Sequence, residues 1–242
     1  MFEEIDQKKN KLDQKRPLPV HTLRSIREHL IVNWTYHSNA IEGNTLTLSE
    51  TKVALEGITI GGKTIKEHLE VINHKEAILY VEDIVRRKEP LSEWQVKSIH
   101  RLILKSIEDE HAGVYRNENV IISGATHIPP DFTQVKGLME DLIQQYEMHW
   151  LSNVHAVERA CLLHIEFVKI HPFIDGNGRT ARLLLNFELM QNGYPPIVIE
   201  KEDRAEYYTA LDVAHTTGDS SQFVGLVKRI LNHTFDLYLR LI

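Results

Sequence analysis

The twelve residues His171-Pro-Phe-Ile-Asp-Gly-Asn-Gly-Arg-Thr-Ala-Arg182 are the most informative segment of the sequence. Pro172 disfavours the α conformation for the residue before it, so a helix predicted over 155–170 ends at His171, with its ring free to project into a cleft. Gly176 and Gly178 permit positive φ angles and close approach of the backbone. A second helix is predicted over 179–192, so the loop ends at a helix N-terminus, where free N–H groups favour an anion.

Two arginines follow this loop. Arg179 and Arg182 lie on one face of the predicted helix, where cations oppose the positive end of its dipole. An anion bound between them would explain the arrangement, because guanidinium groups bind phosphate through two hydrogen bonds. Asp175 could hold Mg²⁺, which proteins bind with one or two carboxylates together with substrate phosphates. The segment therefore predicts a nucleotide-phosphate site beside a histidine.

Upstream, the sequence SNAIEG at residues 38–43 also places a charge at the unfavourable end of a predicted helix. A helix is predicted over 20–42 and ends before Gly43. Glu42 lies in its last turn, where a carboxylate meets the negative end of the dipole. Either this acid is solvated at a small energetic cost, or it has a cationic partner elsewhere, for which Arg179 and Arg182 are the candidates.

Helical periodicity dominates the rest of the chain. Thr47 and Glu50 form a predicted capping box that opens a helix to about residue 56, and further helices are expected over 66–88, 92–107, 133–151, 203–216 and 221–241. Two segments, 57–65 and 113–130, are predicted as small β-hairpins because they alternate and contain turn residues. The expected fold class is therefore all-α, and no linker divides the chain into two domains.

Composition narrows the class of protein. The 242 residues are 42% hydrophobic with a net charge of -6, which excludes a disordered chain and gives no basic surface for nucleic acid or membrane lipid. The single cysteine, Cys161, excludes an intramolecular disulfide framework and a multi-cysteine metal site. The first residues lack an apolar signal region and no apolar run could span a bilayer, so a cytoplasmic protein without membrane or nucleic-acid partners is expected.

The segment HPFIDGNGRTAR at 171–182 resembles the active-site motif HxFx(D/E)GNGRxxR of Fic-domain proteins, and SNAIEG resembles the inhibitory motif (S/T)xxxE(G/N) of that family. The similarity extends through AIEGNTLTLSE at 40–50, HIPP at 127–130 and ELMQNGYPP at 188–196. It implies a Fic fold with a β-hairpin flap from Val120 to Pro129. It also implies a Fic domain over 30–242 that includes an inhibitory helix at about 30–43, preceded by an arm or helix at 1–29 of unknown role.

The resemblance implies transfer of AMP from ATP to a Ser, Thr or Tyr hydroxyl of a protein target, which could be the chain itself. His171 would be the general base and Asp175 the Mg²⁺ ligand. A neutral imidazole titrating near pH 6.5 suits a base at cellular pH. The phosphates would be held by Gly176, Asn177, Gly178, Arg179 and Arg182. Tyr207 and Tyr208 would either line the base or pack within a helix.

The same resemblance assigns Ser38, Glu42 and Gly43 to inhibition, with Glu42 paired to Arg182 so that ATP binds poorly or in an unproductive pose. Four flap residues would dock the target: Val120, Ile121, Ile122 and His127. A homodimer is a further expectation, since relatives of this subclass often form one.

Several alternatives remain. Glu42 could instead position water to remove AMP from a modified protein. His215 stands where the family often has an asparagine that contacts adenine, so another nucleotide could be the donor. The sequence GNGRTA at 176–181 also fits a dinucleotide fingerprint, but Pro172 and the lack of alternating strands argue against an oxidoreductase. A vestigial, partner-binding pocket is disfavoured because the motif is intact.

Overall fold

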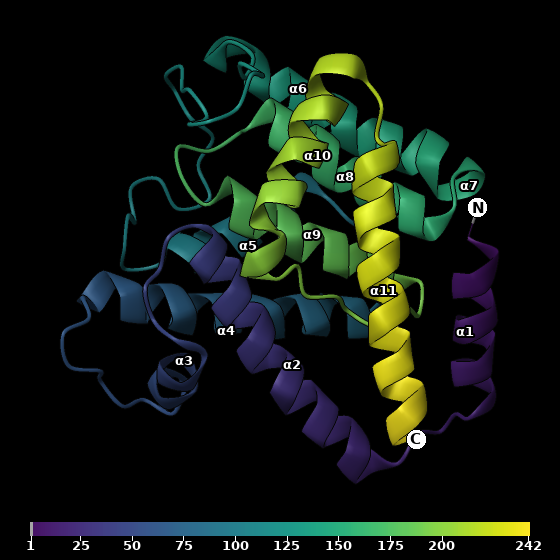
Figure 1. Ribbon diagram of the computed structural model, residues 1–242. Helices are drawn as coiled ribbons and strands as arrows, with labels where there is room; N and C mark the ends of the chain where they lie inside the picture. The colour runs from purple at the N-terminus through teal and green to yellow at the C-terminus, as the bar shows by residue number, and fades with distance from the viewer. Residues whose placement is uncertain (1) are drawn as a thin grey trace.

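The computed structural model describes residues 2–242, apart from the side chains of His149 and Leu151. Every regular element in this described part is helical, which confirms the all-α fold class (Figure 1). The elements are α1 Glu3–Gln14, α2 Val20–Ile41, α3 Leu48–Leu55, α4 Ile65–Arg86, α5 Glu93–Leu104, η1 Phe132–Gln134, α6 Val135–Gln145, η2 Tyr146–Trp150, α7 Leu151–Asn153, α8 Ala156–Ile170, α9 Asn177–Gln191, η3 Lys201–Asp203, α10 Arg204–Thr217 and α11 Ser221–Leu241.

Helix α9 runs through the middle of the bundle, with α8, α4 and α5 packed around it (Figure 1). A helix that is apolar on all sides is stable only when surrounded by protein. Leu183, Leu184, Leu185 and Phe187 follow one another around α9 and are all buried. Each such side chain contributes about 1.5–3 kcal/mol when it leaves water. This packing fixes the N-terminal end of α9, where the predicted phosphate site begins.

The ends of the helices around this point follow the local sequence. Helix α8 ends at His171, which has a φ of 51°, directly before Pro172. Helix α2 ends at Glu42, and Gly43 follows it with a φ of 99°. Both boundaries were expected from the proline and the glycine, and both place a predicted functional residue at the C-terminal cap of a helix.

Two capping boxes organise the segment between α2 and α4. Thr47 and Glu50 form the predicted box at the start of α3, which confirms that interpretation. Thr64 and Glu67 form a second box at the start of α4. In each box the threonine side chain accepts a backbone N–H while the glutamate accepts another, so two otherwise unpaired donors are satisfied. The start of α4 is held close to the end of α2 by separate contacts, because Asn44 Nδ2 donates to Glu67 O and the Thr45 hydroxyl donates to Glu67 Oε1.

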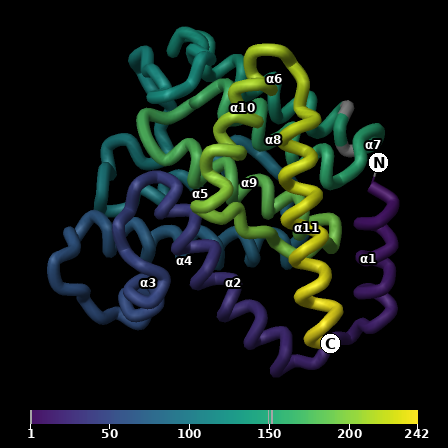
Figure 2. The backbone as a smooth tube through the Cα atoms, viewed as in Figure 1, coloured from purple at the N-terminus to yellow at the C-terminus, as the bar shows by residue number. Residues whose placement is uncertain are grey.

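Helix α1 lies alongside α11 (Figures 1 and 2). Ile5 and Leu12 of α1 are buried in the same hydrophobic core as the rest of the bundle. The Asp6 carboxylate accepts a hydrogen bond from the Tyr194 hydroxyl at 2.9 Å. Residues 3–14 thus contribute to the common core, while the division of the chain at residue 30 stays a prediction.

The two predicted β-hairpins are not present in the described residues. Residues 113–131 form an irregular loop, visible in Figure 2 between α5 and α6, and residues 57–64 form turns. The branched side chains of Val120, Ile121 and Ile122 favour an extended backbone, but a strand also needs a ladder partner. Pro129 and Pro130 remove two donors from the opposite leg of the loop. The flap is therefore a loop held by side chains.

A separate expectation concerned membranes. Among the helices of the described residues, none combines the length and the apolar composition that crossing a bilayer requires.

Candidate active site

His171 stands at the junction of α8 and the motif loop. Its backbone carbonyl accepts a hydrogen bond from Arg116 Nε at 2.9 Å, which helps hold the left-handed conformation of the residue. Burial lowers the pKa of its imidazole to about 4, opposed in part by the nearby carbonyl of Val168. The Nδ1 atom is shielded from solvent, so Nε2 is the nitrogen left to face a substrate. The ring is neutral at pH 7 and can accept a proton.

The loop beneath His171 is rigid because its own side chains bind its backbone. Asn177 Oδ1 accepts from Phe173 N at 3.0 Å and Asn177 Nδ2 donates to Phe173 O at 2.8 Å. The Phe173 ring is buried and stacks on His100, with 3.6 Å between ring centroids. The Asn177 side chain therefore holds the loop, and its backbone N–H is the group left for a phosphate.

Gly176 completes the turn into α9 with a φ of 77°. The first N–H groups of a helix have no partner within it and carry the positive end of its dipole. The structure thus places Asn177, Gly178 and Arg179 in the first turn of a buried helix, as an anion site requires.

Arg182 is the most constrained cation of the site. Its Nε donates to Ser38 Oγ at 3.0 Å, and its Nη2 donates to Ser38 O at 2.9 Å and to Glu42 Oε1 at 2.7 Å. Burial alone would lower the pKa of Arg182, but the Glu42 carboxylate raises it overall. The predicted contact between Glu42 and a motif arginine is therefore present in this structure.

The same glutamate also covers the start of α9. A Cβ atom added at Gly178 would collide with Glu42 Oε1, so the carboxylate lies directly against that glycine. Glu42 is the capping residue directly after α2, and its side chain is about one-third exposed. A carboxylate thus lies at the position that a phosphate oxygen would take at a helix N-terminus.

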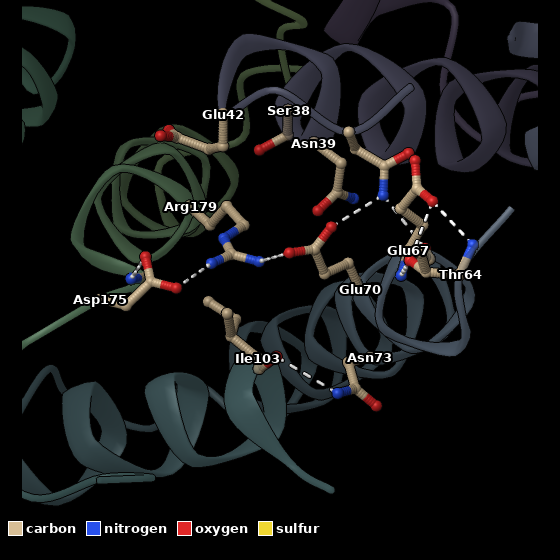
Figure 3. A network of polar contacts seen from close by, with 12 residues as sticks. Ser38, Asn39, Glu42, Thr64, Glu67, Glu70, Asn73, Ile103, Asp175 and Arg179 are labelled. Carbon is tan, nitrogen blue, oxygen red and sulfur yellow. Dashed lines mark hydrogen bonds and ion pairs between the residues drawn. The ribbon is translucent and has the colours of Figure 1, made fainter. Parts of the chain in front are cut away.

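Arg179 is held by two acids from different elements. Its Nη2 donates to Asp175 Oδ2 at 3.1 Å, and its Nη1 lies 3.5 Å from Glu70 Oε1 on α4 (Figure 3). The arginine is only 2% exposed. Both arginines of the motif are therefore paired with carboxylates in this structure, although Nε and Nη1 of Arg179 make no hydrogen bond within the described part of the chain.

Asp175 fits the chemistry expected of a Mg²⁺ ligand. Burial would raise the pKa of this carboxyl group, but Arg179 and the Gly176 N–H lower it overall, so Asp175 is ionised at neutral pH. Its side chain is 44% exposed, at the open edge of the loop. A single accessible carboxylate suits an ion that takes its remaining ligands from water and substrate phosphates.

The flap lies over the same end of the bundle. Arg116 binds both of its legs, since Nη1 donates to Glu118 O at 2.9 Å and Nη2 donates to Pro130 O. On the return leg, His127 N donates to Asp212 Oδ1 at 3.2 Å and its ring contacts Lys169 O at 2.9 Å. Of the predicted docking residues, Ile121 is 85% exposed, while Val120 and Ile122 are half-buried.

The two residues predicted to line the base lie in different environments. Tyr207 is buried, and its hydroxyl lies 3.4 Å from Arg182 Nη1 and 3.0 Å from His164 Nε2, so it packs beneath the arginine. Tyr208 is exposed, with the Arg204 guanidinium over its ring. His215 Nε2 lies 3.0 Å from the carbonyl of Ile165 and its ring packs beside His127.

Sequence reasoning missed three residues of this site. His100 accepts from Gly113 N at 2.9 Å through Nδ1, so Nε2 carries the proton and donates to Asp175 O at 2.8 Å. Arg116 and Glu70 were also not predicted, because their contacts with the motif segment, to His171 O and to Arg179, join residues far apart in the chain. His100 is a histidine in a predicted amphipathic helix, and no local pattern distinguishes it from an ordinary packing residue.

Residues 90–189 match the model of the Fic/DOC family. A protein adenylyltransferase Fic of Nematostella vectensis is 39% identical over 99% of this chain and 56% of its own length. One from Drosophila virilis is 37% identical over 94% of this chain and 48% of its own length. The chain thus spans about half the length of these curated relatives.

Solved structures of Fic proteins are also similar to this chain. A Fic-domain-containing signalling protein from Bacteroides thetaiotaomicron superposes with a TM-score of 0.90 at 31% identity, over 98% of this chain and 96% of that one. A Fic protein from C. elegans superposes with a TM-score of 0.86 at 33% identity, over 98% of this chain and 71% of that one.

Proposed function

We propose that this chain, which belongs to the Fic/DOC family, transfers AMP from ATP to a hydroxyl group of a protein. The observation that carries the proposal is the placement of a neutral, partly buried His171 beside a rigid loop that ends at the N-terminus of buried helix α9. This arrangement offers a base and a phosphate site within one segment. The structure argues against the oxidoreductase alternative. The dinucleotide-binding fingerprint requires a strand before its glycines, and here helix α8 precedes them.

In the proposed reaction, His171 Nε2 accepts the proton of a Ser, Thr or Tyr hydroxyl. The hydroxyl oxygen forms a bond to the α-phosphorus of ATP, and the bond from that phosphorus to the bridging oxygen of the β-phosphate breaks. Pyrophosphate leaves with the electron pair. The N–H groups at the start of α9 would bind phosphate oxygens, and Arg179 and Arg182 would neutralise their charge. When bound at Asp175, Mg²⁺ would shield charge on the phosphates.

We propose further that the structure represents a restrained state. Glu42 Oε1 lies 2.7 Å from Arg182 Nη2 and against Gly178, where a phosphate would otherwise bind. For two unit charges about 4 Å apart, the gross Coulomb attraction is roughly 4 kcal/mol at an intermediate dielectric, before desolvation is subtracted. ATP must displace this carboxylate or bind in a pose that leaves it in place, so the wild-type chain is expected to have low activity.

The test uses ATP labelled at the α-phosphate, with Mg²⁺, and follows label transferred to the chain itself or to proteins in a lysate. Wild type, Glu42→Gly and Glu42→Gly/His171→Ala are compared. Strong labelling by Glu42→Gly alone supports both AMP transfer and restraint by Glu42. Equal labelling by wild type and Glu42→Gly contradicts the restraint. Absence of label in every sample, with ATP still bound, contradicts AMP transfer.

A second function is favoured by one specific contact. The Glu42 carboxylate is held against the start of α9, where it could orient a water molecule toward the phosphorus of an AMP-modified side chain. His171 would then return a proton to the leaving hydroxyl oxygen. Loss of AMP from a pre-modified target in the presence of wild type, but not of Glu42→Gly, would identify removal as the main activity. The donor nucleotide, the target, a homodimer and a cytoplasmic location stay predictions.

A further inference from the structure

The contact between Arg179 and Glu70 belongs to a set of contacts that joins the phosphate site to the segment after α2. Glu70, on α4, lies 3.5 Å from Arg179 Nη1 through Oε1 (Figure 3). Its other oxygen, Oε2, accepts a hydrogen bond from Asn44 Nδ2 at 2.8 Å. One carboxylate therefore contacts a cation of the phosphate site and a residue just past the end of α2 at the same time.

The position of Asn44 depends on the position of Glu42, because both belong to the C-terminal turn of α2. Asn44 follows Glu42 by two residues, and its backbone N–H donates to Asn39 O at 3.1 Å, which closes the C-terminal turn of α2. Its side chain also accepts from Leu46 N at 3.0 Å through Oδ1. The end of α2 is thus tied to α4 through Asn44, independently of the contact between Glu42 and Arg182.

The Glu70 carboxylate and the Arg179 guanidinium form an ion pair that is largely shielded from solvent, although Arg179 Nη1 makes no hydrogen bond to any described residue. The Glu70 side chain is 14% exposed and that of Arg179 is 3% exposed, so solvent screens the pair weakly. Arg179 also binds Asp175, so the chain of contacts runs from the proposed metal ligand through Arg179 and Glu70 to Asn44. An anion bound at Arg179 would compete with Glu70 for the charge of the guanidinium group.

We propose that Glu70 is a positioning residue that couples the end of the inhibitory helix α2 to Arg179. It holds Asn44 and Arg179 together, and so adds a second restraint to the one that Glu42 places on Arg182. The proposal deepens the restrained state described above and rests on nucleotide binding at this site. It does not require that AMP be the group transferred.

Two variants separate the halves of this coupling. Glu70→Gln keeps an oxygen for Asn44 but presents no charge to Arg179. Asn44→Asp keeps an oxygen for Leu46 N, but it turns the contact with Glu70 into a repulsion and removes the hydrogen bond from Asn44 Nδ2 to Glu67 O, which also ties Asn44 to α4. The matched control is Glu76→Gln, because Glu76 lies on the same helix and is 41% exposed beside Lys105, away from the site.

The first readout is the dissociation constant of ATP with Mg²⁺, measured by isothermal titration calorimetry. In the presence of Glu42, both variants are expected to tighten binding about threefold to tenfold, because each removes part of the restraint. In a Glu42→Gly background the effect of Asn44→Asp should disappear, since the restraint then holds no carboxylate in the site. Weaker binding for Glu70→Gln by the same factor in both backgrounds would mean that Glu70 only supports Arg179, and would overturn the proposal.

The second readout needs no nucleotide. Hydrogen exchange of the backbone amides over residues 38–46 should be faster in Asn44→Asp than in wild type or Glu76→Gln, while exchange in α9 stays unchanged. Unchanged exchange at 38–46 would overturn the coupling. Failure of AMP transfer in the labelling experiment would leave both readouts intact, so the two proposals fail separately.

Discussion

Arg182 donates two hydrogen bonds to Ser38, from Nε to the side-chain Oγ at 3.0 Å and from Nη2 to the backbone carbonyl at 2.9 Å. The backbone carbonyl remains after any substitution of Ser38, and Glu42 supplies the only negative charge that hydrogen-bonds to Arg182 among the described residues. Ser38→Ala is therefore expected to tighten ATP binding less than Glu42→Gln, for which we expect about tenfold. Titration calorimetry with Mg²⁺ and ATP measures both. Equal effects would show that geometry, and not charge, blocks the site.

The second prediction separates chemistry from binding. His171 ends α8, whereas the proposed phosphate ligands lie on α9 and its preceding turn. In the Glu42→Gly background, His171→Ala should lower the rate of transfer by about 10²–10⁴-fold, the usual contribution of a general base. The dissociation constant of ATP should change less than about twofold, since the ring contacts no proposed phosphate ligand. A parallel loss of binding would instead mean that His171 holds the nucleotide.

A third prediction concerns pH. Burial lowers the pKa of His100, His171 and His215 to about 4, below the ordinary value of 6.5. Between pH 6.5 and pH 4 the unfolded chain binds more protons at these histidines than the folded chain does. The stability that the neutral histidines allow is therefore fully present above pH 6.5 and is lost as the pH falls through 4. The free energy of unfolding, measured in urea, should fall steadily from pH 6.5 to 5, before most carboxylates protonate. A constant value across that window would contradict the burial of neutral histidines.

Buried charge provides a fourth prediction. Arg159 Nε donates to Glu188 Oε1 at 2.6 Å, and Tyr146 and Asn192 also hydrogen-bond to this carboxylate. Glu188→Ala would leave a buried cation without its main partner and should cost about 3–5 kcal/mol of unfolding free energy. Arg27→Ala, which breaks an ion pair in which Arg27 is half exposed, should cost less than about 1 kcal/mol. Urea unfolding of both variants checks the contrast, and equal losses would contradict it.

The local features of the fold could be predicted because neighbouring residues determine them. Pro172 ends α8, Gly43 follows the end of α2, and the box of Thr47 and Glu50 opens α3 as expected. The flap was predicted wrongly as a hairpin, since the apolar run around Ile121 favours extended backbone but carries no information about a ladder partner. Propensity describes one segment, whereas a strand requires two.

The candidate site divides in the same way. Arg179, Arg182 and Glu42 could be named because each places a charge at the unfavourable end of a helix dipole, and each has a partner of opposite charge in the structure. Glu70 breaks no such rule, since an acid in the second turn of α4 is ordinary, and its partner Arg179 lies more than a hundred residues away. Asn177 was predicted to hold phosphate, but its side chain instead binds the backbone of Phe173 and fixes the loop.

The last prediction uses the space around Gly178. A Cβ atom there would collide with Glu42 Oε1 and lie 3.1 Å from Arg182 Nη1, so Gly178→Ala must displace the Glu42 carboxylate. In the wild-type background the substitution should lower the free energy of unfolding, because the contact between Glu42 and Arg182 is lost. In the Glu42→Gly background the main obstacle is absent, and alanine is favoured over glycine within a helix by about 0.5–1 kcal/mol.

The sign of the change should therefore reverse between the two backgrounds, apart from a small cost at Arg182. Urea unfolding of the four proteins of this double-mutant cycle measures the reversal, and Gly137→Ala serves as the control because a Cβ there meets no atom within 4 Å. That control should behave alike in both backgrounds, since Gly137 lies within α6 and away from Glu42. An equal loss for Gly178→Ala in both backgrounds would show that Glu42 does not lie against the start of α9 in solution. Such a result would also remove the physical basis for restraint by Glu42.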